Sequence, residues 1–132
     1  MPLLHENITS AILACAFEVI NELGTGFLES VYEKSMIIAL TQKGFLVQSQ
    51  QPIAVMFRDC NVGDFYADLL VEEKVIVELK AVKGIVPEHQ AQLINYLNAT
   101  GIEVGLLINF GTPKLEYKRF TRSKDFKINL HG

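Results

Sequence analysis

The sequence predicts an α/β protein whose elements follow the order α-α-β-β-β-β-α-β-β. Three observations predict this class. Apolar residues recur at helical spacing in the N-terminal third of the chain. Short apolar runs bounded by Gly, Pro, Asn and Asp follow, as is typical of strands. A further helical segment then separates these runs from a last pair of apolar stretches.

Two helices are expected first. One covers residues 7–23, with Asn7 or Thr9 as its N-cap and Gly24 after its last turn. The other covers residues 27–43, again with a glycine directly after it.

Six strand-like segments follow, and one helix interrupts them. The helix begins near Pro87, a residue that suits a first helical turn, and ends at Gly101. A turn is expected at residues 61–64, where the sequence is Asn-Val-Gly-Asp. The strand-like segments are residues 45–50, 53–57, 65–71, 75–82, 103–110 and 115–120.

Length and composition indicate a globular protein. Of the 132 residues 49% are apolar and 20% are charged, which excludes a disordered chain, and one domain over residues 1–132 is expected. No apolar run approaches the ~18 residues of a membrane span, and the N-terminus lacks the basic and apolar regions of a signal peptide. Cys15 and Cys60 make neither a disulfide framework nor a metal knuckle. A cytoplasmic location without a membrane partner is expected.

The charges are unevenly distributed along the chain. The net charge is −3, but residues 1–113 hold six Lys or Arg against thirteen Asp or Glu, which gives −7. Residues 114–132 hold six against two, which gives +4. This basic C-terminal strip is expected either to contact a polyanion or to form a solvated tail that balances an acidic body.

Two adjacent strand-like segments carry charges that need partners in a buried sheet. Asp68 lies in the first, and Glu78 and Lys80 lie in the second. Residues two apart in a strand share a face, about 6.6 Å apart along the chain. Unpaired buried charges cost several kcal/mol each. A hard divalent cation held by carboxylate oxygens, with a lysine beside it, would satisfy these groups and support hydrolytic chemistry.

The connection between the two segments tests this idea. A slip of one residue in register moves a side chain to the opposite face of the sheet. A two-residue turn would pair Leu69 with Glu78 and point Asp68 away. A connection with one residue more or fewer, or a bulge, can pair Asp68 with Glu78. We therefore expect residues 72–74 not to form a simple two-residue turn.

The third expected helix carries hydrogen-bonding side chains near one face. Gln92 and Tyr96 are four residues apart, and His89 precedes Gln92 by three. If directed at the charged strands, they would contact a phosphate or a metal-bound water. If directed away, they would only meet solvent, and the spacing leaves both alternatives open.

Glu29 falls in the first turn of the second expected helix. The helix dipole stabilises a carboxylate there by roughly 0.3–1 kcal/mol, which explains the residue without any functional role. Gly24 and Gly26 instead indicate close backbone packing that would bring Glu29 near the charged strands.

Several motifs, taken in order, resemble those of a known family. Gly26-Phe-Leu-Glu29-Ser-Val-Tyr32 resembles the motif that names the bacterial GxxExxY proteins, which are similar to the PD-(D/E)xK nuclease superfamily. The other matching motifs are Tyr66-Ala-Asp68, Glu78-Leu-Lys80, Gln92-Leu-Ile-Asn-Tyr96 and the strand at residues 105–111. The resemblance covers nearly the whole chain and implies a restriction-endonuclease-like mixed β-sheet flanked by helices. One departure is Ala67, where a proline is usual before the aspartate.

The resemblance also implies a metal-dependent nuclease. Asp68 and Glu78 would bind Mg²⁺ or Mn²⁺ with help from the backbone carbonyl of Leu79, and Glu29 would match a further acidic residue at the metal. Lys80 would position or activate the attacking water and stabilise the charge that develops on phosphorus.

The third expected helix has a place in the same resemblance. Gln92 and Tyr96 resemble the QxxxY pattern of exonuclease-like members, in which the glutamine lies near the metal site. His89 is no part of this pattern, and its expected contact with the substrate or the groups that bind it rests on its helical spacing alone.

Three functional hypotheses remain. The first is a metal-dependent nuclease acting on DNA or RNA, as a homodimer because so small a chain has little surface for gripping a duplex. The second is a nuclease-fold module that binds nucleic acid or a partner protein without cleaving. The third is a structural charge cluster with Lys80 paired to Glu78 or Asp68, which is poor stabilisation compared with apolar residues.

Overall fold

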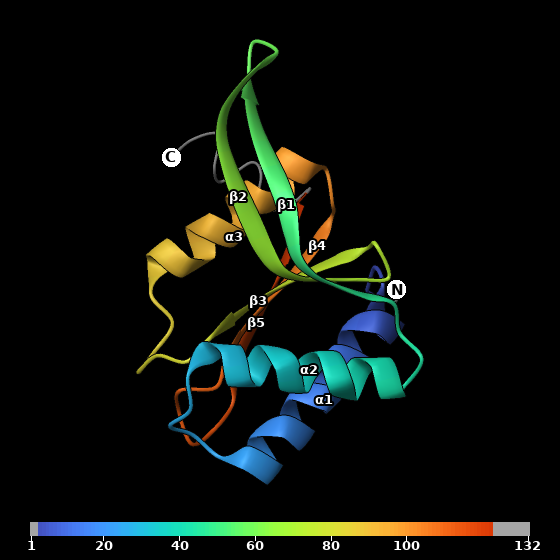
Figure 1. The fold of residues 1–132 in the computed structure, drawn as a ribbon, viewed down its shortest axis with the longest axis vertical. Helices are drawn as coiled ribbons and strands as arrows, with labels where there is room; N and C mark the ends of the chain where they lie inside the picture. Colours follow the sequence, from blue (N-terminus) through green and yellow to red (C-terminus); the bar gives the residue numbers. More distant parts are fainter. Residues whose placement is uncertain (1–2, 123–132) are drawn as a thin grey trace.

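A five-stranded β-sheet lies between two helices on one face and a single helix on the other (Figure 1). The computed structural model describes residues 3–122 of the chain. Helices α1 (Glu6–Leu23) and α2 (Glu29–Gln42) cover one face, and helix α3 (Pro87–Thr100) covers the other. No described helix is both long and apolar enough to cross a membrane.

The sheet is mixed, as expected. Its strands lie side by side in chain order, and only β3 and β4 run parallel to each other, joined by α3. All other neighbours are antiparallel. The strands are β1 (Val47–Phe57), β2 (Cys60–Val71), β3 (Val75–Lys80), β4 (Val104–Asn109) and β5 (Glu116–Thr121).

Alternation along β3 assigns its side chains to the two faces. Val77 and Leu79 pack in the core formed with α1 and α2. Ile76 packs in the smaller core formed with α3. Because side chains two apart share a face, Glu78 and Lys80 follow Ile76 on the α3 side of the sheet.

The first two expected strands, residues 45–50 and 53–57, form one continuous strand, β1. The order of helices and strands otherwise agrees with the expectation. The break expected between residues 50 and 53, at Pro52, does not occur. β1 is an edge strand, where the missing N–H of a proline costs no ladder hydrogen bond. The irregularity is instead local, since Gln50 has a φ of 51° within the strand.

The turn expected at residues 61–64 is wrong, because these residues lie inside β2. The chain reverses at Arg58 and Asp59, which have φ values of 50° and 65° and connect the paired residues Phe57 and Cys60. The resulting β1–β2 hairpin extends beyond the rest of the sheet (Figure 1).

The ends of the first helices differ slightly from the expectation. Asn7 and Thr9 lie within α1 rather than capping it, and His5 precedes the helix without a side-chain capping bond. Gly24 follows the helix as expected. In the basic C-terminal strip, Lys118 donates to Gln90 Oε1 at 3.2 Å, and the segment 123–132 lies outside the described residues.

Candidate active site

A three-residue connection sets the register of β2 and β3, which confirms the expectation for residues 72–74. Val71 pairs with Val75, and the pairing continues to Leu69 and Val77. Glu72 and Glu73 both have left-handed φ values, 54° and 57°. One further step in this register brings Asp68 opposite Glu78, on the same face of the sheet.

The backbone ladder between β2 and β3 ends at this step, and the two carboxylates take its place. Glu78 Oε2 accepts a hydrogen bond from the Asp68 N–H at 2.7 Å, and Asp68 Oδ2 accepts one from the Leu79 N–H at 2.8 Å. In a strand the N–H and C=O of one residue point to the same side, so the Leu79 carbonyl also points toward Asp68. Three oxygen-bearing groups therefore converge where the strands separate.

Burial makes these carboxylates hard to ionise. Glu78 is only 4% exposed, and Asp68 is half-buried. Desolvation, together with the nearby charge of Asp68, raises the pKa of Glu78 to about 8. Desolvation also raises the pKa of Asp68, although the Leu79 N–H and the charge of Lys80 oppose the increase. Both shifts favour the protonated, neutral forms of these carboxylates, so a cation bound between them would stabilise their ionised forms.

Lys80 does not form the ion pair that a structural charge cluster requires. Its Nζ lies 3.5 Å from Gln92 Oε1 and donates to it. Among the described residues, the one ion pair within 4.0 Å joins Lys43 and Glu18, far along the chain from this site. The Lys80 charge acts on both carboxylates at longer range, so the structural-cluster hypothesis loses its central contact.

Glu29 lies close to the two carboxylates. It is the first residue of α2, and desolvation and the charge of Asp68 raise its pKa, while Lys80 lowers it. The structure therefore favours a place for Glu29 beside the charged strands over a role at the helix start alone. The first turn of α2 still suits a carboxylate, because the helix dipole stabilises it.

The Gly26–Tyr32 motif explains how Glu29 is held. Tyr32 is fully buried, stacks on Phe110 at 4.7 Å, and donates its hydroxyl to the Gly24 carbonyl at 2.7 Å. It thereby anchors the loop before α2. Gly24 and Gly26 have φ values of 74° and 103° with nothing within 4 Å of an added Cβ. These glycines are needed for backbone conformation, so the expectation of close packing is wrong.

Helix α3 places two of its three candidate side chains at the site. Gln92 contacts Lys80, as described above. Tyr96 is 6% exposed, and desolvation and the charges of Glu78 and Asp68 raise its pKa. His89 instead accepts a hydrogen bond from the Val86 N–H at 3.2 Å through Nδ1, which stabilises the start of α3.

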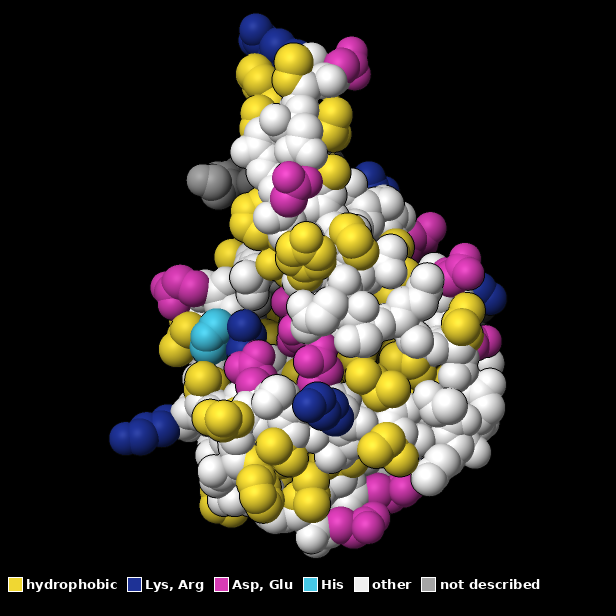
Figure 2. Space-filling model, in the orientation of Figure 1, with side chains coloured by type: hydrophobic (Ala, Val, Ile, Leu, Met, Phe, Trp, Pro, Cys, Tyr) yellow, Lys and Arg dark blue, Asp and Glu magenta, His cyan; other side chains and the backbone are white. Residues whose placement is uncertain are grey.

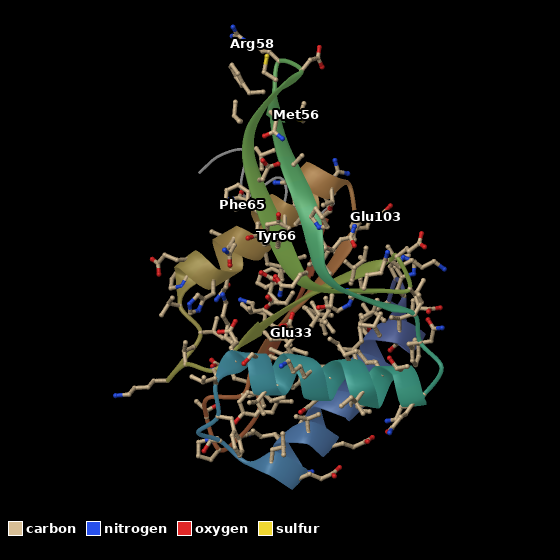
Figure 3. All side chains as sticks on the ribbon, in the orientation of Figure 1. Glu33, Met56, Arg58, Phe65, Tyr66 and Glu103 are labelled. Atoms are coloured by element: carbon tan, nitrogen blue, oxygen red, sulfur yellow. The ribbon has the colours of Figure 1, made fainter. Side chains whose placement is uncertain are left out.

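Two further residues lie at the site that the sequence analysis did not identify. Gln50 lies near enough to Asp68 to lower the pKa of that carboxyl, and its Nε2 donates to Glu33 Oε1 at 2.6 Å. Glu33 lies in the middle of the view, between α2 and the sheet (Figure 3). Its spacing of four from Glu29 is a helical-face signal that could have found it, whereas the irregular backbone at Gln50 has no such signal.

The donor set fits a hard divalent cation. In the part of the chain that the structure describes, no three Asp, Glu, His or Cys side chains already form a ligand cluster. Two carboxylates and a backbone carbonyl nevertheless converge, and oxygen ligands of this kind suit Mg²⁺ and Mn²⁺. In the space-filling view, acidic and basic side chains lie together below the base of the hairpin (Figure 2).

Comparisons with known proteins agree on one superfamily. A model described as the PD-(D/E)XK nuclease superfamily matches residues 6–120. A comparison with curated proteins finds no match.

Two solved structures share the fold. An alkaline exonuclease (LHK-Exo) from Laribacter hongkongensis is 11% identical with a TM-score of 0.56, over 99% of this chain and 77% of that one. The crystal structure of SSO0001 is 14% identical with a TM-score of 0.53, over 76% of this chain, and the match spans 58% of SSO0001. At these identities the likeness concerns the fold alone. Because the family model covers nearly all of the described residues, the chain belongs to the PD-(D/E)XK nuclease superfamily.

Proposed function

We propose that the protein is a metal-dependent nuclease that hydrolyses phosphodiester bonds of DNA or RNA. One observation carries the proposal. Asp68 and Glu78 oppose each other in a half-buried site, and the nearest lysine leaves both without an ion pair. Members of this superfamily typically use divalent metal ions. Such an arrangement supports a role in cation and phosphate chemistry rather than in stability.

Each side chain has a proposed role. Asp68, Glu78 and the Leu79 carbonyl would hold Mg²⁺ or Mn²⁺, with Glu29 close by. The bound ion would neutralise the phosphate charge and lower the pKa of a water molecule. Lys80, on the same face as Glu78, would orient that water and stabilise the developing negative charge.

The remaining groups support this arrangement. Gln92 would restrain Lys80 through the 3.5 Å contact, and Gln50, held by Glu33, would favour the ionised form of Asp68. Tyr96 closes the α3 side of the site. His89, already engaged at the start of its helix, stays a prediction as a substrate contact.

A cleavage assay with point variants and matched surface controls tests the function. Wild-type protein is expected to cut at least one of single-stranded DNA, duplex DNA, branched DNA and RNA in Mg²⁺ or Mn²⁺. Asp68→Asn and Lys80→Ala should each lower the cleavage rate on the order of 100-fold or more, because general acid–base catalysis and electrostatic stabilisation each contribute rate factors of this size. The exposed residues Asp59 and Lys83 provide matched controls, since Asp59→Asn and Lys83→Ala should cut normally.

Full activity in Asp68→Asn would contradict the proposed site. The non-cleaving module is the second candidate, because residues 1–113 carry a charge of −7 and offer little to a duplex. It would be favoured if wild-type protein cuts nothing and calorimetry detects no Mn²⁺ uptake.

We also infer membership of the GxxExxY family within the superfamily. The support is that Gly26, Glu29 and Tyr32 act together here, one shaping the loop, one facing the site and one anchoring the helix. We further propose that residues 1–132 act as one domain and as a homodimer. A monomer in sedimentation at micromolar concentration would contradict the dimer. The cytoplasmic location stays a prediction.

A further inference from the structure

A groove of about 770 Å³ opens between the β1–β2 hairpin and α3. This volume falls within the ~300–1,000 Å³ typical of small-ligand sites. Phe65 and Met56 belong to the hairpin wall, and both are exposed, at 45% and 55% (Figure 3). The opposite wall is α3.

The groove is continuous with the candidate active site. Gln92 and Tyr96 line it. Gln92 also contacts Lys80, and desolvation and the charges of Glu78 and Asp68 raise the pKa of Tyr96. The rings of Phe65 and Tyr96 lie 6.0 Å apart and are tilted by 45°. A group held in the groove would therefore lie next to the phosphodiester bond at Asp68 and Glu78.

The lining selects the chemistry of the occupant. Among residues 3–122, no lysine or arginine lines the groove, and Glu88 contributes a negative group, so these walls would repel a phosphate backbone. The walls are mainly apolar and aromatic, with the amides of Asn95 and Asn98 among them. Asn98 Oδ1 is buried without a hydrogen-bond partner in the described part of the chain. A flat, neutral group with hydrogen-bonding edges fits these walls.

We propose that the groove binds an unpaired nucleobase of the strand being cut, so that the substrate is single-stranded nucleic acid or the open end of a duplex. This inference rests on the proposed nuclease function. A base inside a duplex is stacked and paired and does not enter such a groove without first being extruded. An unpaired base stacks on exposed aromatic side chains in many proteins that bind single strands.

The test is the binding of matched oligonucleotides to Asp68→Asn protein, which is not expected to cut. Fluorescence anisotropy would compare a single strand, its blunt duplex, and the same single strand with abasic positions. Phe65→Ala should weaken binding of the intact single strand by roughly 5- to 100-fold, the loss of one stacked base. It should leave binding of the abasic strand unchanged, since no base is there to stack.

Two further variants separate the groove from general damage. Ala91→Phe fills the groove from α3 without removing a contact, and should weaken binding of the intact strand as Phe65→Ala does. Phe57 lies at the tip of the same hairpin and outside the groove lining, so Phe57→Ala should bind like the parent. Urea unfolding would show that each variant folds.

The outcomes distinguish this inference from the proposed function. Equal loss on intact and abasic strands, or no loss in either groove variant, would overturn the base site even if wild-type protein cleaves. A base-dependent loss would support the site even if wild-type protein cuts nothing in Mg²⁺ or Mn²⁺, in which case only the nuclease proposal fails.

Discussion

At the scale of single residues, Glu78 determines how the site behaves without metal. It is the one buried carboxylate among the described residues, and its Oε2 accepts a hydrogen bond from the Asp68 N–H. A raised pKa means that the folded protein holds a proton that the unfolded chain releases near its ordinary value. The contribution to stability is therefore complete below about pH 4.5 and is lost as the pH rises through about 8.

Glu78→Gln should remove this pH dependence. The amide cannot ionise, so the metal-free variant is expected to be more stable than wild type by about a few kcal/mol near pH 9 and similar near pH 4.5. Urea unfolding in EDTA at both pH values measures the difference. Glu22→Gln, on the exposed surface of α1, should follow wild type. Parallel pH curves for wild type and Glu78→Gln would mean that Glu78 ionises freely in the folded protein.

The sequence predicted the residues whose surroundings are regular. Asp68, Glu78 and Lys80 stand in apolar strands, where a charge is conspicuous and period-two alternation fixes its face. Gln50 could not be predicted, because it reaches Asp68 from an irregular point of an edge strand. The contact depends on a backbone angle that no local pattern encodes.

At the scale of elements, the connection between β2 and β3 positions the site. Its three residues set the register, and the Lys74 N–H donates to the Val71 carbonyl at 3.0 Å to close the turn. From the charges alone, the sequence predicted that this connection is not a two-residue turn, but it left open whether the connection is longer, shorter or bulged. It did not predict the hairpin turn at Arg58 and Asp59, because the stronger turn residues lie just beyond it, where Asn61 bonds to the Gly63 N–H inside β2.

Glycine substitutions at Glu72 and Glu73 should differ in their effect on stability. A left-handed φ costs a residue with a side chain about 1–2 kcal/mol, and glycine's flexibility offsets about 0.5–1 of the gain. Glu73→Gly is therefore expected to stabilise the fold by about 0.5–1 kcal/mol. Glu72 accepts a hydrogen bond from the Leu46 N–H at 2.6 Å, so Glu72→Gly also loses about 1 kcal/mol and gains nothing. Urea unfolding measures both variants. Greater stability in Glu72→Gly than in Glu73→Gly would contradict this account.

At the scale of the whole molecule, the distribution of charge limits how nucleic acid is held. The acidic body of residues 1–113 surrounds a site whose carboxylates have raised pKa values. Apolar side chains instead line the hairpin and its base (Figure 2). Affinity should thus come from base contacts and the metal ion more than from neutralised phosphates.

The salt dependence of binding measures this balance. Each neutralised phosphate of a single strand contributes a slope of about −0.7 in log affinity against log salt concentration. With two or three phosphate contacts, affinity should fall only on the order of 10-fold between about 50 and 200 mM salt, whereas six to ten contacts would cost about a thousandfold or more on a duplex. Anisotropy titrations of Asp68→Asn protein in Mg²⁺ give the slope. Lys118 lies in the described part of the basic strip and already donates a hydrogen bond to Gln90. Lys118→Ala should therefore reduce the magnitude of the slope by less than the ~0.7 expected for one phosphate contact. A steep slope that falls strongly in this variant would instead make the basic strip the main binding surface, with the groove in a minor role.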